Sequence, residues 1–292
     1  AVEDVIASGE YGLVPQFKNL WPASSAKVAE KGDYETLKGT YAGDGNKETI
    51  LALKFTATQD YNGNNDSNRW QVMLGMRQLN AAPYCKGWGA LTVNPDFVEA
   101  FPTGDLRRSA SIIDLVGEGI TRFRPTFTTS FNDWREYTGY AVKKYAPLCY
   151  ADGSHAGKQD GSGDFQTQNR QDYVIIRYAD VLLMAAELGS PNAQTYFDQV
   201  RKRAYQVDDN GTGNRANYQA KSVSQQAIME ERRLEFAFES INYWDLLRQG
   251  IDVAAEKLAL NGVKVKSGGA DDAITIRVDR VKANQRLEPD SL

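Results

Sequence analysis

The sequence contains very few of the residues that most enzyme and metal sites use. Among 292 residues it has one histidine, His155, and two cysteines, Cys85 and Cys149. The motifs G-x-S-x-G and H-E-x-x-H and a phosphate-binding P-loop are all missing. These absences argue against a serine hydrolase, a zinc metalloprotease and a P-loop NTPase. We expect no catalytic or metal-binding role for His155, which lies in a glycine-rich segment, and no bound cofactor.

Neither a membrane span nor a nucleic-acid-binding stripe can be found in the chain. The longest apolar stretch, residues 181–188, contains Glu187 and is far shorter than the roughly 18 apolar residues that a helical span needs. The 34 basic and 38 acidic side chains give a net charge of −4, and no Lys/Arg block dominates. Nucleic-acid binding needs such a positive stripe, so we expect no nucleic-acid partner.

The two cysteines lack the spacing of metal ligands, such as C-x-x-C. One disulfide between Cys85 and Cys149 and two buried free thiols are both compatible with the sequence. The Gly/Ser-rich loop at 151–164 is predicted to be exposed and mobile. Three of its carboxylates could hold Ca²⁺ in a flexible oxygen cage, although their spacing matches no EF-hand: Asp152, Asp160 and Asp164.

The chain divides by pattern into three regions of one unit, residues 1–292. Residues 1–56 contain a first helix that Gly9 can end in the left-handed conformation. Residues 57–170 are dense in turn formers and predict a loop-rich, ligand-binding region. Residues 171–292 predict a helical scaffold. We therefore expect a mainly α fold with a few short strands.

Periodicity predicts the elements of the last region more sharply than those of the others. Residues 172–188 place their apolar side chains on one stripe and predict a single helix, and residues 193–205 repeat this pattern. Ser222 followed by Gln225 predicts a capping box at the start of a third helix. Alternating apolar residues predict short strands near residues 46–55 and 273–278.

Two helical segments carry dense charge inside an apolar pattern, at residues 177–187 and 230–239. Such charges must be paired or solvated. They could form a solvated face, an Arg–carboxylate network that clamps helices together, or a paired-carboxylate glycosidase site built on Glu231 and Glu235. The clamp is the interpretation that we favour. Arginines beside each glutamate would lower a carboxyl pKa, whereas a general acid needs a raised one.

The sequence resembles the SusD/RagB family in several blocks that occur in the family's order and spacing. The blocks are VIASGEYGL at 5–13, YVIIRYADVLLMAAE at 173–187, VRKRA at 200–204, IMEERRLEFAFE at 228–239 and WDLLR at 244–248. The family's N-terminal part and its lipid-anchor cysteine are missing. The chain therefore looks like a fragment of such a protein.

The resemblance implies tetratricopeptide-like helix pairs packed against a loop-rich region. It also implies a non-catalytic lipoprotein on the outer face of the outer membrane of Bacteroidetes, held by a lipid anchor outside this chain. Such a protein binds an oligosaccharide, or in some members a peptide. It delivers this ligand to a SusC-like TonB-dependent transporter. The family's conserved blocks are scaffold, so the ligand site cannot be transferred by motif.

The candidate site is therefore inferred from chemistry. Sugar rings stack on Trp and Tyr, and their hydroxyls bond to Asn, Asp, Gln and Arg side chains. These residue types coincide most densely between Tyr61 and Trp88. Trp70 is the first choice as stacking platform, whereas Trp88, between two glycines, is expected to be structural. The predicted ligand-binding residues are Tyr61, Asn62, Asn65, Asp66, Arg69, Trp70 and Tyr84.

Overall fold

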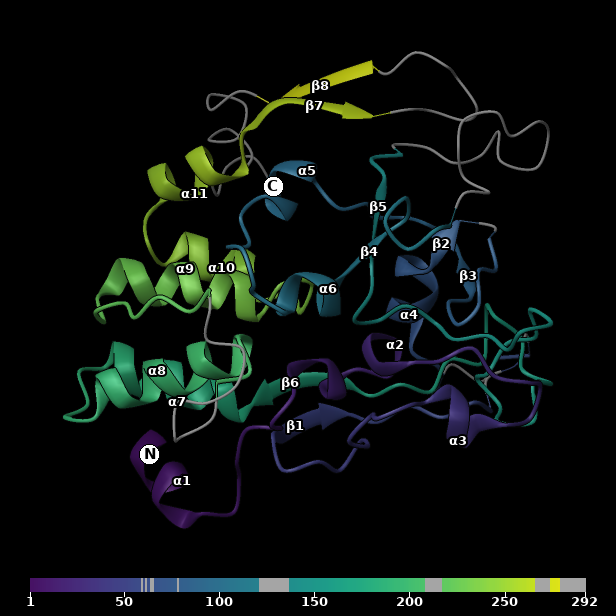
Figure 1. The fold of residues 1–292 in the computed structure, drawn as a ribbon, viewed down its shortest axis with the longest axis horizontal. Coiled ribbons are helices and arrows are strands. Elements are labelled where there is room, and N and C mark those ends of the chain that lie inside the picture. The colour runs from purple at the N-terminus through teal and green to yellow at the C-terminus, as the bar shows by residue number, and fades with distance from the viewer. Residues whose placement is uncertain are drawn as a thin grey trace.

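The computed structural model describes residues 1–58, 60, 62–63, 66–77, 79–120, 137–207, 217–265 and 274–278. Helices predominate and the strands are short, which confirms the mainly α fold class (Figure 1). The helices are α1 (Val2–Ser8), the 3₁₀ helix η1 (Phe17–Leu20), α2 (Pro22–Ser25), α3 (Tyr34–Leu37), α4 (Arg69–Leu74), α5 (Pro95–Val98), α6 (Arg107–Ser111), α7 (Tyr178–Glu187), α8 (Ala193–Ala204), α9 (Gln225–Glu235), α10 (Asn242–Leu247) and α11 (Ile251–Leu258).

Strands pair only in twos within the described residues. The antiparallel pairs are β1 (Thr49–Leu53) with β6 (Tyr173–Arg177), β4 (Ile112–Asp114) with β5 (Tyr140–Val142), and β7 (Leu260–Val265) with β8 (Ile274–Val278). The parallel pair is β2 (Met76–Arg77) with β3 (Lys86–Gly87). The pair of β1 and β6 joins segments more than a hundred residues apart in sequence.

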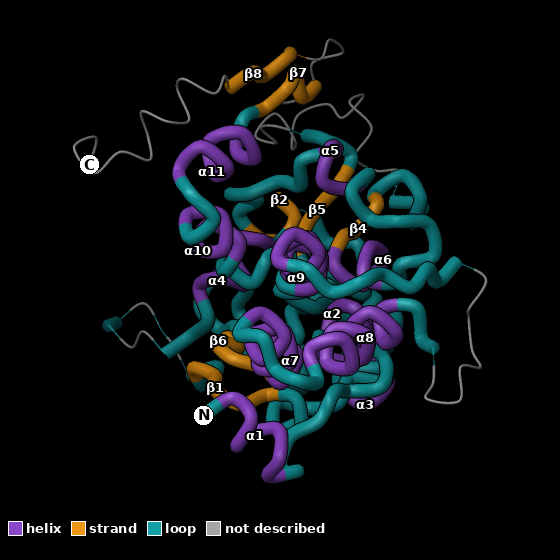
Figure 2. The backbone as a smooth tube through the Cα atoms, turned by 90° about the vertical axis from the view of Figure 1, so that its left-hand side faces the viewer, coloured by secondary structure: helices purple, strands orange, loops and turns teal. Residues whose placement is uncertain are grey.

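The C-terminal helices form a compact group around α7 and α8, which lie side by side with α1 below and α9 above (Figure 2). Their shared core contains fully buried residues from three helices: Ala179, Leu182, Leu183, Phe197, Val200 and Ile228. Two further cores lie under the loop-rich part. One surrounds Leu37, Met76 and Tyr150, and the other surrounds Phe17, Trp21 and Tyr145.

The first five residues after Asp172 in the predicted 172–188 helix form a strand. Residues Tyr173–Arg177 form β6, and α7 begins only at Tyr178. The prediction was wrong because Val174, Ile175 and Ile176 are β-branched and favour extended backbone. Their partner strand lies more than a hundred residues earlier, so local periodicity could not reveal it. Ile175, predicted on the buried stripe, is instead 43% exposed.

Helix boundaries elsewhere follow the predictions with small shifts. Gly9 ends α1 in the left-handed conformation, at φ 68°, and its N–H bonds to the carbonyl of Ile6. The third C-terminal helix is capped by Ser224 rather than Ser222, because the Ser224 hydroxyl accepts a 3.1 Å bond from the N–H of Ala227. The predicted strands near 46–55 and 273–278 correspond to β1 and β8.

The loop at 151–164 is more ordered than its composition predicted. His155 and Ala156 are 5% exposed, and Ala156 joins one of the cores. Isolated bridges pair His155 with Cys149 and with Gly163. The loop therefore folds back on the body of the protein instead of extending into solvent. Both cysteines are buried.

Candidate functional site

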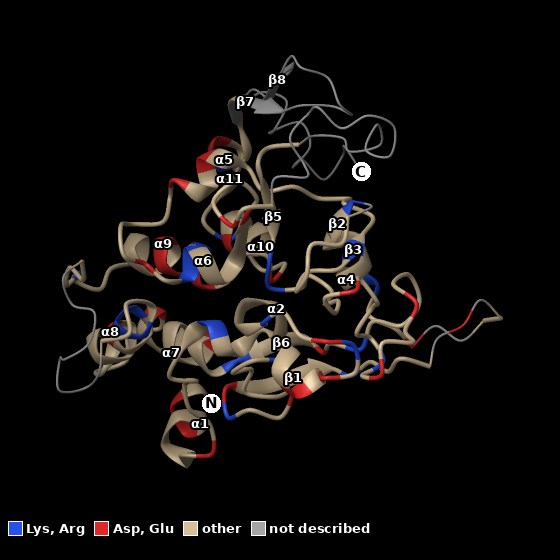
Figure 3. Cartoon of the chain, turned by 45° about the vertical axis from the view of Figure 1, so that its right-hand side comes forward, with Lys and Arg blue, Asp and Glu red and all other residues tan. Residues whose placement is uncertain are grey.

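The charged motifs of the sequence meet in one buried network. Arg177, at the end of β6, is its centre. Its Nη1 atom lies 2.7 Å from Glu48 Oε1 and 2.5 Å from Glu235 Oε1, and its Nε atom lies 2.9 Å from Glu239 Oε2. Figure 3 shows basic segments in blue on α6 and acidic segments in red on α9. We call this set, with Arg107, Arg203, Glu231 and Lys144, the charged brace.

Arg107 and Arg203 connect the brace to two further helices, α6 and α8. Arg107, in α6, contacts Glu231 at 2.6 Å and Glu235 at 3.0 Å. Arg203, in α8, contacts Glu48 at 2.7 Å. Burial alone would raise the pKa of Glu235, but the three arginine guanidiniums outweigh burial and hold that pKa well below its usual range.

The brace cannot serve as a glycosidase pair. Glu231 and Glu235 are 2% and 0% exposed, so a substrate bond cannot reach them. A carboxyl with a lowered pKa is also ionised at neutral pH, whereas a general acid must carry a proton. The geometry supports the clamp between helices that the sequence favoured.

The sole histidine and two aspartates of the 151–164 loop form hydrogen bonds that stabilise the local structure. Burial lowers the pKa of His155 to about 4, and its Nε2 atom lies 3.2 Å from Asn169 Oδ1. Asp152 and Asp160 each accept bonds from the serine two residues later and so hold their own turns. No group of three or more His, Cys, Asp or Glu side chains suitable for a metal occurs among the described residues.

An exposed aromatic and cationic surface lies where α4 meets the segment after β3. Trp88 is 36% exposed, and the Arg69 guanidinium lies 5.6 Å from the centre of its ring. Trp88 Nε1 donates a 3.4 Å bond to Gln166 Oε1, and Arg69 Nη1 donates a 2.9 Å bond to the carbonyl of Gln166. Beside them Lys86 lies 4.5 Å from the centre of the Phe165 ring. We call these five residues the Trp88 face.

Glycines explain how Trp88 reaches the surface. A Cβ atom on Gly87 would lie 2.4 Å from the Val72 carbonyl oxygen, and one on Gly89 would lie 2.6 Å from Arg77 Cβ. Without side chains at both positions, the segment packs closely against α4 and β2. The Trp88 N–H then donates a 2.7 Å bond to the Val72 carbonyl and its ring turns outward.

A buried polar network fixes the two segments that carry the Trp88 face. Asn68 caps α4 by accepting a 2.9 Å bond from the Trp70 N–H, and its amide donates to the Gln171 carbonyl at 2.7 Å. Gln71 and Gln171 exchange bonds of 3.0 and 3.1 Å. Asn169 is 1% exposed, and its amide donates to the Phe165 carbonyl at 2.9 Å. These buried hydrogen bonds therefore preorganise the Trp88 face.

A pocket of about 410 Å³ adjoins the Trp88 face and shares Arg69 with it. Ligand pockets usually measure about 300–1,000 Å³, so this one can take a small ligand. Trp70 forms part of its wall while also packing against a core. The indole nitrogen of Trp70 has no hydrogen-bond partner among the described residues. The lining residues are Phe55, Ser67, Asn68, Arg69, Trp70, Tyr173 and Ser240.

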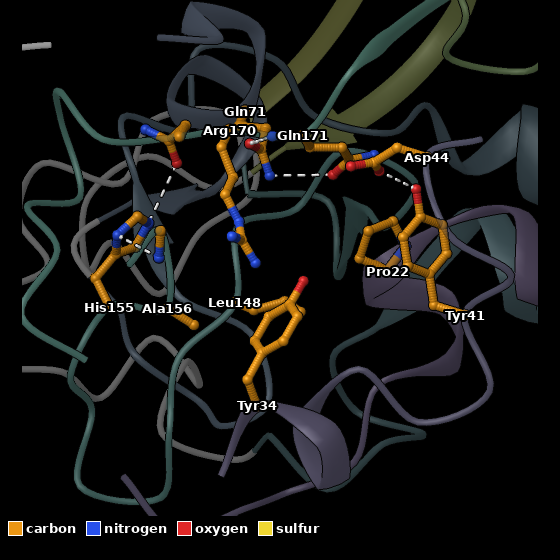
Figure 4. Close-up of a pocket in the computed structure, with 12 residues that line it drawn as sticks. Pro22, Tyr34, Tyr41, Asp44, Gln71, Leu148, His155, Ala156, Arg170 and Gln171 are labelled. Atoms are coloured by element: carbon orange, nitrogen blue, oxygen red, sulfur yellow. Dashed lines mark hydrogen bonds between the residues drawn. The ribbon is translucent and has the colours of Figure 1, made fainter. Parts of the chain in front are cut away.

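Two other hollows are weaker candidates. Figure 4 shows a cavity of about 40 Å³ into which Arg170 points, with its guanidinium 4.8 Å from the centre of the Tyr34 ring. That volume suits water rather than a sugar ring. A groove of about 730 Å³ runs between residues 11–16 and α8, and its lining includes Tyr11, Gln199 and Lys202. It has no exposed ring with a charged partner like that of Trp88.

The structure brings together only part of the predicted site. Arg69 and Trp70 lie side by side at the start of α4. Asn62 is exposed nearby in sequence, and Asp66 accepts bonds from the hydroxyls of Thr56 and Thr58. Tyr61 and Asn65 lie outside the described residues.

The burial of Tyr84 and Trp88 is the reverse of what the sequence suggested. Tyr84 is 7% exposed and donates a 2.7 Å bond to Glu118, so its ring is not available to a ligand. Trp88, expected to be structural, is exposed. Its flanking glycines were the one signal that could have identified it, because they permit a close backbone approach.

Comparisons with known proteins agree with this architecture. The model of the SusD family matches residues 47–289, so the chain belongs to the SusD family. A SusD-like protein of Formosa agariphila is 26% identical over 249 residues, which cover 80% of this chain and 40% of that protein. The chain thus spans less than half the length of this curated relative.

Solved structures show the same fold. A laminarin-binding SusD-like protein is 28% identical with a TM-score of 0.58, covering 85% of this chain and 48% of that one. Surface glycan-binding protein A from Bacteroides thetaiotaomicron, in complex with laminarihexaose, is 22% identical with a TM-score of 0.60, covering 87% and 50%. No helix among the described residues is long and apolar enough to cross a membrane.

Proposed function

We propose that this chain binds an oligosaccharide on the Trp88 face and in the adjoining pocket. The observation that carries the proposal is the exposed Trp88 ring, held by Arg69 and Gln166 beside a hollow of ligand size. An indole face offers the C–H surface of a sugar a stacking partner, and the surrounding amide and guanidinium groups can bond its hydroxyls.

The ligand class that we propose to test first is a laminarin-type glucan. Support comes from the 28% identical relative, which is described as laminarin-binding. The chain's small net charge of −4 suits a neutral glycan. A peptide is the alternative ligand, and a peptide-binding screen beside a glycan array separates the two.

We further propose that the whole protein acts without catalysis. It would capture the glycan at the outer face of the outer membrane and deliver it to a SusC-like TonB-dependent transporter. Membership of the SusD family supports this role. The burial and pairing of Glu231 and Glu235 support the absence of hydrolysis. A lipid anchor would hold the protein at the membrane.

Isothermal titration calorimetry with laminari-oligosaccharides tests the binding proposal. Trp88→Ala is expected to weaken binding about five- to tenfold, because stacking on one aromatic ring contributes about 1–1.5 kcal/mol. Tyr11→Ala is the matched control, since Tyr11 lines the rival groove along α8. Unchanged affinity in Trp88→Ala with a loss in Tyr11→Ala would move the site to that groove.

Trp70→Ala is a less clean test. The ring lines the pocket, but it also packs against a core. A loss of affinity in this variant therefore has to be read together with its free energy of unfolding.

A further inference from the structure

Cys85 and Cys149 lie on two segments that are joined by an antiparallel bridge between Tyr84 and Leu148. Each cysteine directly follows one member of this pair. Successive side chains of extended backbone point to opposite faces, so both thiols leave the bridge on the face away from Tyr84 and Leu148. Two backbone bonds close the bridge: Cys85 N–H to the Pro147 carbonyl at 2.7 Å, and Cys149 N–H to the Pro83 carbonyl at 2.9 Å.

The two thiols share a closed environment. Cys85 is 1% exposed and Cys149 is 0% exposed. A hydrogen bond with the Cys85 thiol, together with burial, raises the pKa of the Cys149 thiol. Cys149 Sγ donates to the Tyr84 carbonyl at 3.1 Å, and Cys85 Sγ donates to Asn80 Oδ1 at 3.4 Å.

Metal binding does not explain this pair. A structural zinc site needs four ligands, usually cysteine or histidine. No third ligand of a suitable type gathers with these two within the described part of the chain. The two cysteines lie on one face of the same bridge, and Cys149 Sγ reaches the carbonyl of Tyr84, the residue directly before Cys85.

We propose that Cys85 and Cys149 form a disulfide when the protein folds in an oxidising compartment. The two thiols lose two protons and two electrons and gain one S–S bond. An external disulfide, such as an oxidised dithiol oxidoreductase or glutathione disulfide, accepts the electrons and protons and leaves as two thiols. Because both sulfurs are buried in the folded protein, this exchange takes place during folding, before the bridge closes.

The disulfide would hold in place the segment that carries Trp88 of the proposed glycan site. It fixes residue 85, three residues before Trp88, to the segment around residue 149. Cross-linking residues that are far apart in sequence restricts the unfolded chain, and such a loop predicts a higher melting temperature by about 5–10 °C. The disulfide proposal rests on the proposed function in one respect only, which is that the protein folds outside the cytoplasm, where disulfides form.

Refolding from denaturant in a glutathione redox buffer tests the proposal without reference to any ligand. The refolded protein is acid-quenched, denatured and treated with N-ethylmaleimide, and its mass is measured. The expected result is no maleimide adduct, a mass lower by two hydrogens than that of the reduced protein, and a linked Cys85–Cys149 peptide after digestion. Two adducts per chain, after refolding under conditions that oxidise a control disulfide protein, would overturn the proposal.

Melting temperatures supply the second readout. The oxidised protein should melt at a higher temperature than the reduced protein, and the Cys85→Ala/Cys149→Ala double variant should be indifferent to the redox buffer. Equal melting temperatures for oxidised and reduced protein would contradict the stabilising role. The thiol count is independent of laminari-oligosaccharide binding, so a failure of the glycan proposal and a failure of the disulfide proposal remain distinguishable.

Discussion

The charged brace and the Trp88 face both contain arginine, but the arginine of the brace is buried among carboxylates and the arginine of the face is exposed beside an aromatic ring. In the brace, Arg177 contacts three carboxylates and is 2% exposed. On the face, Arg69 is exposed and its charge lies over an indole ring rather than beside a carboxylate. An arginine whose donors are already satisfied holds helices together, whereas one stacked on an exposed ring keeps donors available for a ligand.

This difference explains why the most recognisable sequence blocks are not the candidate site. The blocks at 173–187, 200–204 and 228–239 supply most members of the brace. The face comes from residues with little periodicity, held by buried amides such as those of Asn68 and Gln171. Stability and ligand capture are therefore expected to respond to separate mutations.

The largest effect is expected from breaking the brace. Arg177→Met leaves Glu48, Glu235 and Glu239 buried with too little positive charge, which should cost about 3–5 kcal/mol in the free energy of unfolding. Lys221→Met removes an exposed charge from a surface pair and should change stability by about 0.5 kcal/mol or less. Urea unfolding monitored by circular dichroism measures both. Equal stability losses would remove the brace from this account.

A smaller effect is expected from filling the close contact behind Trp88. Gly87→Ala places a Cβ atom 2.4 Å from the Val72 carbonyl oxygen, so backbone must move, at a cost of about 1–3 kcal/mol. Displacement of the segment should also weaken oligosaccharide binding. Gly45→Ala, where no atom lies within 4 Å, is the matched control. Calorimetric titration and urea unfolding that show no difference between the two variants would argue against this packing.

Mild acid is expected to lower the free energy of unfolding through His155, which contacts Asn169 behind the Trp88 face, before it protonates the carboxylates of the brace. Burial lowers the pKa of His155 to about 4 from 6.5, so the unfolded chain binds a proton in a pH range where the folded chain does not. Stability then falls as pH decreases, by about 2 kcal/mol between pH 7 and pH 5. Glu235 has a lowered pKa, so the stability that its ion pairs contribute is lost only in stronger acid.

Unfolding titrations of His155→Gln at both pH values isolate this contribution. The variant should lose most of the dependence between pH 7 and pH 5 that the parent shows. An identical slope in parent and variant would mean that another group titrates in this range.

The smallest effect is expected from the cation on the face. Arg69→Met removes the guanidinium above Trp88, and exposed cation–π contacts contribute about 0.5–1 kcal/mol, so affinity should fall about two- to fivefold. Arg108→Met, on the exposed side of α6, is the control. Titration calorimetry with the same oligosaccharide compares them, and equal affinities would separate Arg69 from the ligand.

Local patterns in the sequence were sufficient for many elements of the fold. Gly9 ended α1 as predicted, and the apolar stripe of residues 193–205 became α8. The density of arginine beside glutamate predicted the clamp, since unpaired charge cannot be buried. β6 could not be predicted, because its partner β1 lies far away in sequence.

The candidate site was harder to predict for a similar reason. Composition pointed to the stretch of chain that contains Trp88 but not to which rings face outward. Tyr84 became buried through a bridge to Leu148, and Trp88 was exposed by close packing at Gly87. Gln166 and Phe165 came from a segment that no local pattern connected to Trp88. The Trp88 face depends on long-range contacts, which the sequence alone does not display.

A single titration tests most directly whether ligand is captured at the face rather than at the brace. The indole N–H signals of the tryptophans can be followed by ¹⁵N–¹H NMR while laminari-oligosaccharide is added, with assignments from Trp→Phe variants. The signal of Trp88 should shift in proportion to saturation, while that of Trp21, which is 1% exposed and packs beside Lys144 of the brace, should stay in place. An unmoved Trp88 signal at saturating ligand would contradict the account.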